Sequence, residues 1–160
     1  MFLALVMTAA MAGQSTGPGV VDRLQQFCLA TEMREAAFVR VAQEQGMERL
    51  IRVVRSVDDI DHSEWDSMFR GGGLSVGMTG RAGEDVATYC AVMLPVPAED
   101  WRGDGARLAE AMGLVPADAE TPDDVLEMHM WSDPEGEQPS LVYMLYRSSL
   151  VVSLERRANP

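Results

Sequence analysis

The segment Gly73-Leu74-Ser75-Val76-Gly77 has the G-x-S-x-G spacing of a nucleophile elbow, which presents the catalytic serine of many hydrolases. Such a serine needs a histidine and a carboxylate beside it. The candidates in this chain are His129 and one of Asp104, Asp123 or Asp124. An elbow joins a strand to a helix, whereas Ser75 lies in an alternating pattern that leads into a turn and a second strand. We therefore rank a small serine hydrolase last and expect a non-catalytic protein.

Met128-His129-Met130 places two thioethers next to an imidazole, and these ligands suit Cu(I). In a strand, residues 128 and 130 point to one face and residue 129 to the other, so one ion collects all three only if the strand bulges. Nine methionines follow residue 12, and their scatter is typical of core side chains. Core packing is our main interpretation, and a periplasmic copper-handling protein is the alternative.

An acidic stretch covers residues 58–66 and contains Asp59, Asp61 and His62, so it is rich in the oxygen ligands that Ca²⁺ prefers. Its spacing does not match a helix-loop-helix calcium loop, because Glu64 stands where that loop needs a glycine. We interpret the stretch as a solvated connection between two elements. A Ca²⁺ site at Asp59, Asp61 and His62 remains the alternative.

Residues 2–12 form an apolar run that ends in Ala10-Met11-Ala12, the small-x-small pattern of a secretory cleavage site. A run of about a dozen residues is shorter than the roughly 20 that span a bilayer. We predict a signal peptide over residues 1–12, a flexible segment over 13–19 and a single globular domain over 20–160. The mature protein would be periplasmic or secreted, with no stable membrane insertion after cleavage.

The predicted export would place the two cysteines, Cys28 and Cys90, in an oxidising compartment. In an oxidising compartment an even number of cysteines favours a disulfide. A reactive or metal-binding thiol would need a partner such as histidine, and neither His62 nor His129 is close to either cysteine in the sequence. We expect the bridge Cys28–Cys90.

The composition limits the partners and the chemistry. The formal net charge is -12, which disfavours nucleic acid and anionic membrane surfaces as partners, and all 13 basic residues are arginine. The absence of lysine removes Schiff-base catalysis and the phosphate-loop lysine. We expect no cofactor, and we expect a protein or small-molecule ligand bound on the sheet or on the acidic surface. The oligomeric state is left open.

The first part of the chain is predicted to be helical over residues 20–45, as one long or two short helices. Thr31 is the expected cap of the second segment, and Gly46 is the expected left-handed residue at its end. Residues 50–57 fit a strand or a helical turn equally well. Trp65, with Met68 and Phe69 at helical spacing, predicts a turn of helix packed on the sheet.

Strand patterns dominate the rest of the chain. Residues 74–79 and 86–93 predict a hairpin, with Val86, Thr88, Cys90 and Val92 facing the first helix. Asp104 is the expected cap of a helix that ends at Gly113, with Trp101 just before it. Three short strands are predicted at 125–131, 141–147 and 150–155.

These elements predict an α+β fold, and no internal repeat is visible in the sequence. In it, the N-terminal helices and one further helix pack on a mainly antiparallel sheet, made of the hairpin plus a C-terminal three-strand meander.

Overall fold

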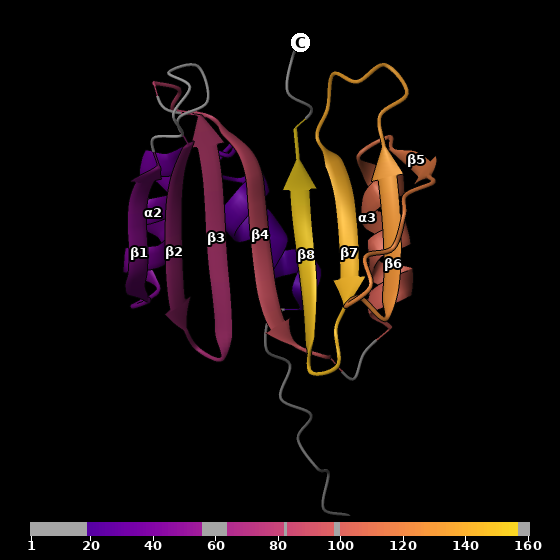
Figure 1. The fold of residues 1–160 in the computed structure, drawn as a ribbon, viewed down its shortest axis with the longest axis horizontal. Coiled ribbons are helices and arrows are strands. Elements are labelled where there is room, and N and C mark those ends of the chain that lie inside the picture. The colour runs from indigo at the N-terminus through magenta and orange to yellow at the C-terminus, as the bar shows by residue number, and fades with distance from the viewer. Residues whose placement is uncertain (1–18, 56–63, 82, 98–99, 157–160) are drawn as a thin grey trace, which may run out of the picture.

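Eight antiparallel strands form one sheet in the computed structural model, which describes residues 19–55, 64–81, 83–97 and 100–156. The strand order is β1-β2-β3-β4-β8-β7-β6-β5 (Figure 1). The strands are β1 (Glu48–Arg55), β2 (Glu64–Gly71), β3 (Leu74–Arg81), β4 (Ala87–Pro95), β5 (Val115–Ala117), β6 (Glu127–Ser132), β7 (Ser140–Leu145) and β8 (Ser149–Glu155). With the helices packed on this sheet, the predicted α+β class is confirmed.

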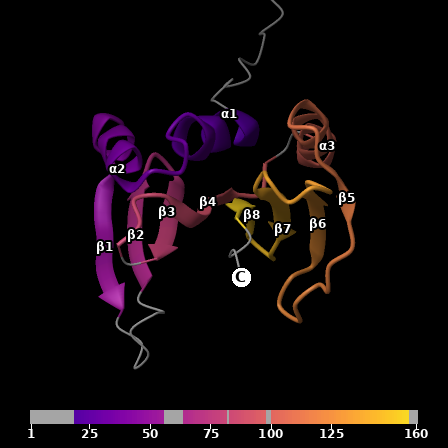
Figure 2. The ribbon, with the colours of Figure 1, turned by 90° about the horizontal axis from the view of Figure 1, so that it is seen from above.

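The helices all lie on one side of the sheet (Figure 2). They are α1 (Val20–Leu24), the π-helical turn η1 (Gln25–Leu29), α2 (Glu35–Glu44) and α3 (Trp101–Ala111). On the other side, no helix among the described residues covers the strands. Nor is any helix in the described ranges long and apolar enough to cross a membrane.

The N-terminal helical region is split, as one of the two predicted alternatives had it, but its predicted cap is wrong. The hydroxyl of Thr31 donates to the carbonyl oxygens of Phe27 and Cys28, at 2.7 and 3.1 Å, and so closes the first helical segment. The second segment, α2, begins at Glu35 with Arg34 as its N-cap residue. A threonine can satisfy carbonyls behind it as well as amides ahead of it, and here it does the former.

The predicted disulfide is confirmed. Cys28 in η1 and Cys90 in β4 are bonded, with their Cα atoms 5.8 Å apart, and both side chains are fully buried. Cys90 and Val92 face the helices as predicted, but the predicted side does not continue through Thr88, because the register with β3 shifts there and Ala87 is the buried residue instead. The bridge therefore fastens the first helical segment to the middle of the sheet.

Strands β2 and β5 were not predicted, and the region of β1 had been left open between a strand and a helical turn. The region around Trp65 is strand β2 rather than a helical turn, and it pairs with both β1 and β3. In β2, Phe69 is buried under the helices whereas Met68 points to the uncovered side, which is the period of two of a strand. The undecided region after Leu50 belongs to strand β1, and the short β5 adds an edge beside β6.

The third helix starts earlier than predicted. Its N-cap residue is Asp100, whose carboxylate accepts a hydrogen bond from the backbone N–H of Gly103 at 3.1 Å. Asp104 lies within the first turn instead, and Trp101 is the first helical residue. The predicted end is confirmed, because Gly113 has a φ of 73°. After this helix, the three predicted C-terminal strands are present as β6, β7 and β8, in an antiparallel meander.

The chain forms the sheet in two halves of the same topology. In each half a helix leads into four antiparallel strands: α2 precedes β1–β4, and α3 precedes β5–β8. The last strands of the halves, β4 and β8, pair antiparallel at the centre of the sheet. With both helices on one side, the halves are related by an approximate twofold axis that is perpendicular to the sheet and passes between β4 and β8 (Figures 1 and 2).

Candidate functional site

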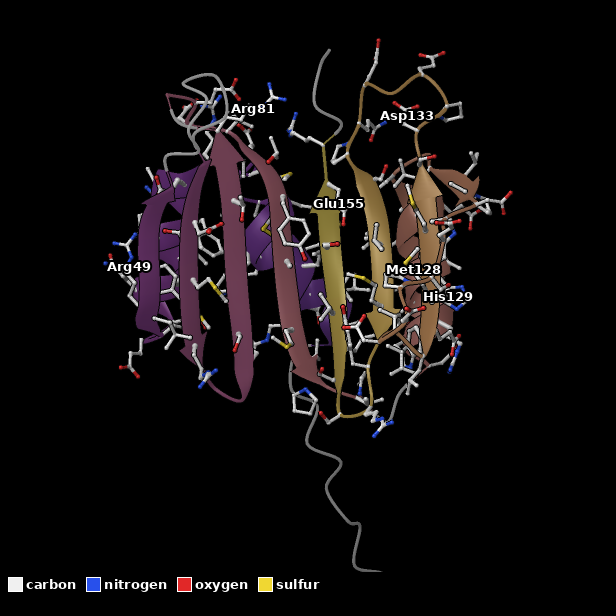
Figure 3. All side chains as sticks on the ribbon, viewed as in Figure 1. Arg49, Arg81, Met128, His129, Asp133 and Glu155 are labelled. Carbon is white, nitrogen blue, oxygen red and sulfur yellow. A yellow bond between two sulfur atoms is a disulfide. The ribbon has the colours of Figure 1, made fainter. Side chains whose placement is uncertain are left out.

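The side of the sheet on which no described helix lies is the candidate binding surface, because it carries many apolar side chains together with a few polar ones. Strand alternation places every second residue on it, and five of these residues are methionines from four different strands. We call this surface the Met face (Figure 3). Its outward residues are Met68, Ser75, Gly77, Ala91, Met93, Met128, Met130, Val142, Met144 and Val151.

A hollow of about 360 Å³ lies in the Met face. Its floor is formed by two small residues, Gly77 of β3 and Ala91 of β4, which are paired in register. A Cβ atom added at Gly77 would lie 3.6 Å from Cγ of Met68, so this glycine opens onto the hollow. The side chains around the floor belong to Met68, Met93, Met144, Tyr89, Tyr146 and Val151.

One end of the hollow is polar. The hydroxyl of Thr79 donates to the carboxylate of Asp66 at 2.7 Å, and both side chains line the hollow. Burial first, and then the negative charge of Glu155, raise the pKa of Tyr89. Tyr89 is thus a neutral hydrogen-bonding group at physiological pH. The hollow offers an apolar floor with hydrogen-bonding groups at one end.

The prediction that the methionines are core side chains holds for some of them only. Met33, Met47 and Met78 are core side chains as predicted, with at most 8% of their surface exposed. Met93, in contrast, is 40% exposed on the Met face. Alternation along the strand distinguishes the core methionines from those on the Met face. Met68 is next to the buried Phe69, and Met128 and Met130 alternate with the buried Trp131.

The proposed copper ligands do not converge on one point. Met128 and Met130 lie on the Met face, whereas His129 points to the helix side, where its Nε2 is 2.6 Å from a carboxylate oxygen of Glu127. All three line a cavity of about 310 Å³ at the edge of β6. The structure adds a thioether that sequence reasoning did not include, because Met144 pairs directly with Met128 across β6 and β7.

The acidic candidates lie outside the described residues: this holds for Asp59, Asp61 and His62. Within the described ranges, no group of three or more His, Cys, Asp or Glu side chains is arranged to hold a metal ion.

The serine motif is not assembled into a triad. Ser75 lies on β3 and lines the hollow on the Met face, and β3 continues through a turn into β4 rather than into a helix. His129 is on β6 and points to the opposite side of the sheet. Because the sheet separates the two side chains, His129 does not activate Ser75.

On the helix side, His129 belongs to an aromatic cluster that holds α3. Its ring is stacked on Trp131, with centroids 5.9 Å apart, and makes an edge contact with Trp101 at 6.0 Å. Tyr143 completes the cluster beneath Trp101, and its buried hydroxyl has no hydrogen-bond partner in the described part of the chain. Desolvation of that hydroxyl raises the pKa of Tyr143. The tryptophans Trp101 and Trp131 are therefore packing residues, as expected, and not a ligand platform.

An ion cluster ties the same helix to β6. The guanidinium of Arg102 pairs with both carboxylate oxygens of Glu127 and lies over the ring of Trp101, 4.2 Å from its centroid. Hydrogen bonds from Arg102 first, and then from His129, lower the pKa of Glu127 to about 2. The carboxylate is held ionised as an ion-pair partner, which makes it a poor general base.

Sequence reasoning also missed a cavity of about 410 Å³ on the helix side, where the turn after η1 meets the second half of the chain. It is lined by Cys28, Met33, Arg34, Met112 and Arg156 among others. Two consecutive residues of that turn, Glu32 and Met33, have left-handed φ angles of 54° and 56°. No motif in the sequence marks this cavity.

Comparison with protein-family models, with curated proteins and with solved structures finds no match to this chain.

Proposed function

We propose that this is an exported, non-catalytic binding protein that holds an apolar segment of a partner protein on the Met face. The observation that carries the proposal is the hollow over Gly77 and Ala91 on a sheet side that no described helix covers. A sheet normally buries its apolar face against another layer, so an apolar face without one favours a partner.

Methionine suits this role physically. Its unbranched thioether side chain adapts to surfaces of different shape, and methionine-rich surfaces are used where one site accepts varied apolar segments. The net charge of -12 favours a segment flanked by basic residues, because opposite charge steers association. The ligand class is therefore an apolar stretch of protein with positive charges beside it.

The disulfide supports the export part of the proposal. Cys28–Cys90 is a fully buried structural bridge, and such bridges persist in the periplasm or outside the cell rather than in the cytosol. The mass of the unreduced protein, recovered from the exported fraction, tests this part. We expect cleavage after Ala12 and the loss of two hydrogens, and a full-length cytoplasmic protein with two free thiols would overturn it.

Binding is tested by photocrosslinking in the producing cell. We would place a diazirine-bearing amino acid at Met93, the exposed methionine on the Met face, and at Ala36, an exposed residue on α2, as the control. A covalent adduct with another protein at position 93 but not at position 36 is the expected result. Adduct patterns that do not differ between the two positions would refute the proposal.

A second variant makes the test quantitative. In Gly77→Leu the added side chain fills the hollow, and its Cβ has ordinary van der Waals room, so the fold should be retained. We expect this variant to bind the crosslinked partner at least ten-fold more weakly than Ala36→Leu does. Equal affinity of the two variants would place the binding site elsewhere.

Pairing of Met144 with Met128 favours Cu(I) carriage as a second candidate function, because it brings a third thioether to Met128 and Met130. The test is competition for Cu(I) against bicinchoninate. Met144→Leu and Met130→Leu should each weaken binding at least ten-fold, whereas Met47→Leu, on the helix side, should not. Without Cu(I) retention by the unmodified protein, this candidate fails.

A further inference from the structure

We propose that the cavity of about 410 Å³ on the helix side is a second binding site, which takes a small amphipathic carboxylate, a molecule with an apolar tail and one negatively charged head group. The site is separate from the Met face, and the proposal does not depend on the function proposed for that face. Three features of the cavity carry it: largely apolar walls from both halves of the chain, two arginines at its rim, and a strained turn that forms one of its sides.

The walls of the cavity are largely apolar and come from segments far apart in the sequence. The segment before α2 contributes Leu29 and Met33, and the second half of the chain contributes Met112, Pro139 and Leu154. Met33 and Leu154 are at most 2% exposed, so the inner part of the cavity lies against the hydrophobic core. Small-molecule sites have volumes of about 300–1,000 Å³ and occur preferentially between structural units. This cavity meets both conditions and suits the tail of a small apolar molecule.

Two arginines lie at the rim, and both are anchored to the segment that leads into β4. Arg34 forms a backbone bridge with Val86. The backbone N–H of Arg156 donates to the carbonyl oxygen of Thr88 at 2.7 Å. Val86 and Thr88 are two residues apart, roughly 7 Å along an extended chain. The side chains of Arg34 and Arg156 both line the cavity, so their guanidinium groups can reach the same head group.

The ion pairs at the rim leave one arginine for a ligand. Arg34 pairs with the carboxylates of Asp85 and Glu32, the latter at 3.6 Å, and these pairs hold its guanidinium in place. Arg156 has no ion-pair partner in the described part of the chain. Arginine binds a carboxylate through two parallel N–H donors. The head group therefore pairs with Arg156, and Arg34, whose guanidinium has five N–H donors, supplies a further hydrogen bond.

The other charges favour a ligand with a single negative charge. Glu32 lines the cavity beside Arg34, and the whole chain has a net charge of -12. Both repel a doubly charged phosphate more strongly than a carboxylate. A neutral head group, in turn, would form no ion pair with Arg156. The ligand class is therefore a monocarboxylic acid with an apolar chain.

The turn on one side of the cavity is strained, and its side chains line the site. Glu32 and Met33 have left-handed φ angles of 54° and 56°, which glycine adopts at a much lower cost. The chain nevertheless has side chains at both positions: Met33 forms part of the buried wall, and Glu32 pairs with Arg34 at the rim. Backbone strain of this kind clusters at binding sites. The turn thus positions the wall and the rim together.

Isothermal titration calorimetry with sodium decanoate tests the site. We expect saturable binding of one decanoate per chain, and at least ten-fold weaker binding of butyrate, because each buried CH₂ group of the tail adds to the affinity. Arg156→Gln should weaken the binding of decanoate at least ten-fold. The matched control is Arg40→Gln, a change of an exposed arginine on α2, which should leave the affinity unchanged. Both arginines are exposed, so both variants should fold.

Each alternative gives a different result. Decanol that binds as tightly as decanoate would remove the role of the head group, and decyl phosphate that binds more tightly would assign the cavity to phosphate esters. Either result overturns the proposal, as does the absence of decanoate binding.

The Met face is a competing apolar site for the same probe. Gly77→Leu fills its hollow and should leave the binding of decanoate unchanged. If Gly77→Leu abolishes the binding and Arg156→Gln does not, decanoate binds on the Met face. The proposal for the cavity then fails, whereas the function proposed for the Met face stands.

Discussion

The two halves of the molecule have the same topology and the same junction between helix and sheet. In the first half, α2 ends in Gln45-Gly46-Met47, and in the second, α3 ends in Met112-Gly113-Leu114. Both glycines have left-handed φ angles, of 67° and 73°, and the next residue is buried in both. The backbone hydrogen bonds of the two junctions also correspond one to one. The two halves can therefore be aligned on these glycines.

With this alignment, the first half has the larger side chain on its helix, and the second half has the larger side chain on its sheet. Phe38 on α2 corresponds to Gly105 on α3, and through the strand registers Met78 on β3 corresponds to Tyr143 on β7. In the first half, the ring of Phe38 on the helix packs edge-on against Phe69 of β2, with centroids 5.7 Å apart. In the second half, Gly105 on the helix lies directly against the ring of Tyr143 on β7.

The two helices also carry opposite charges at one corresponding position. Glu35 on α2 and Arg102 on α3 occupy corresponding positions, and each pairs with the opposite charge on a strand, Arg49 and Glu127 respectively. The strand partners are not at corresponding positions, because Arg49 is on β1 whereas Glu127 is on β6. Individual residue types are not retained, so a repeat in structure leaves no repeat in sequence.

The largest difference between the halves is the Cys28–Cys90 disulfide, which fastens the start of the first half to β4 at the centre of the sheet. Cys28→Ala, Cys90→Ala should lower the free energy of unfolding by about 4 kcal/mol, because the bridge closes a long loop across a sequence separation of 62. Urea denaturation of the oxidised protein and the variant measures this. The reduced unmodified protein is the control and should match the variant. A loss below about 1 kcal/mol would show that packing alone holds η1 on the sheet.

Because the large side chain of the second half is on the sheet, we predict that α3 tolerates no side chain at Gly105. A Cβ there would lie 3.1 Å from Cζ of Tyr143 and 3.3 Å from Cη2 of Trp131, two rings that already pack against each other. Gly105→Ala should lower the free energy of unfolding by about 2 kcal/mol despite its better helix propensity. Gly77→Ala, which has room, is the matched control.

A double-mutant cycle sharpens this comparison. Tyr143→Met gives β7 the residue that β3 has at the corresponding position, and it vacates the space that the alanine needs. The cost of Gly105→Ala should largely disappear in the Tyr143→Met background. An unchanged cost in that background would show that the alignment of Gly105 with Phe38 has no energetic meaning.

The two junction glycines should behave alike. No atom lies within 4 Å of a Cβ added at Gly46 or Gly113, so only the left-handed backbone opposes a side chain there. Gly46→Ala and Gly113→Ala should each cost about 1 kcal/mol. Thermal unfolding of the two variants should give the same shift in Tm. Unequal shifts would mean that the junctions differ in strain, contrary to their matching hydrogen bonds.

Local patterns were sufficient for much of this fold. Three features of the sequence each indicate one structure directly. They are the alternation in β3 and β4, the two junction glycines and the single pair of cysteines. They predicted the hairpin, the ends of α2 and α3 and the bridge. These are features in which backbone geometry or covalent chemistry admits few residue types.

The remaining features depend on the uncovered side of the sheet. A strand with apolar residues on both sides loses its alternation, so Trp65, Met68 and Phe69 indicated a helix although they belong to β2. The same cause concealed the Met face, because Met128 and Met130 alternate with Trp131 rather than with polar residues. The pairing of β4 with β8 joins segments about 60 residues apart, and no local pattern specifies it.

The smallest expected effect concerns the ion cluster of the second half. The pKa of Glu127 falls from its ordinary value of 4.5 to about 2 in the folded protein, mainly through the hydrogen bond from Arg102. Since the folded pKa is the lower one, the stabilisation is fully present above about pH 4.5 and is lost as the pH falls towards 2. The side chains of Arg102 and Glu127 are 51% and 30% exposed, and solvent screens a pair of this exposure, so the effect should stay below about 1 kcal/mol. Glu127→Gln should flatten the decrease in unfolding free energy between pH 6 and pH 3, which urea denaturation measures. The control is Glu110→Gln, an exposed change on α3, and it should leave that decrease intact. If both variants keep the slope of the unmodified protein, Arg102 and Glu127 do not hold α3 on the sheet, and the aromatic cluster beneath the helix does so alone.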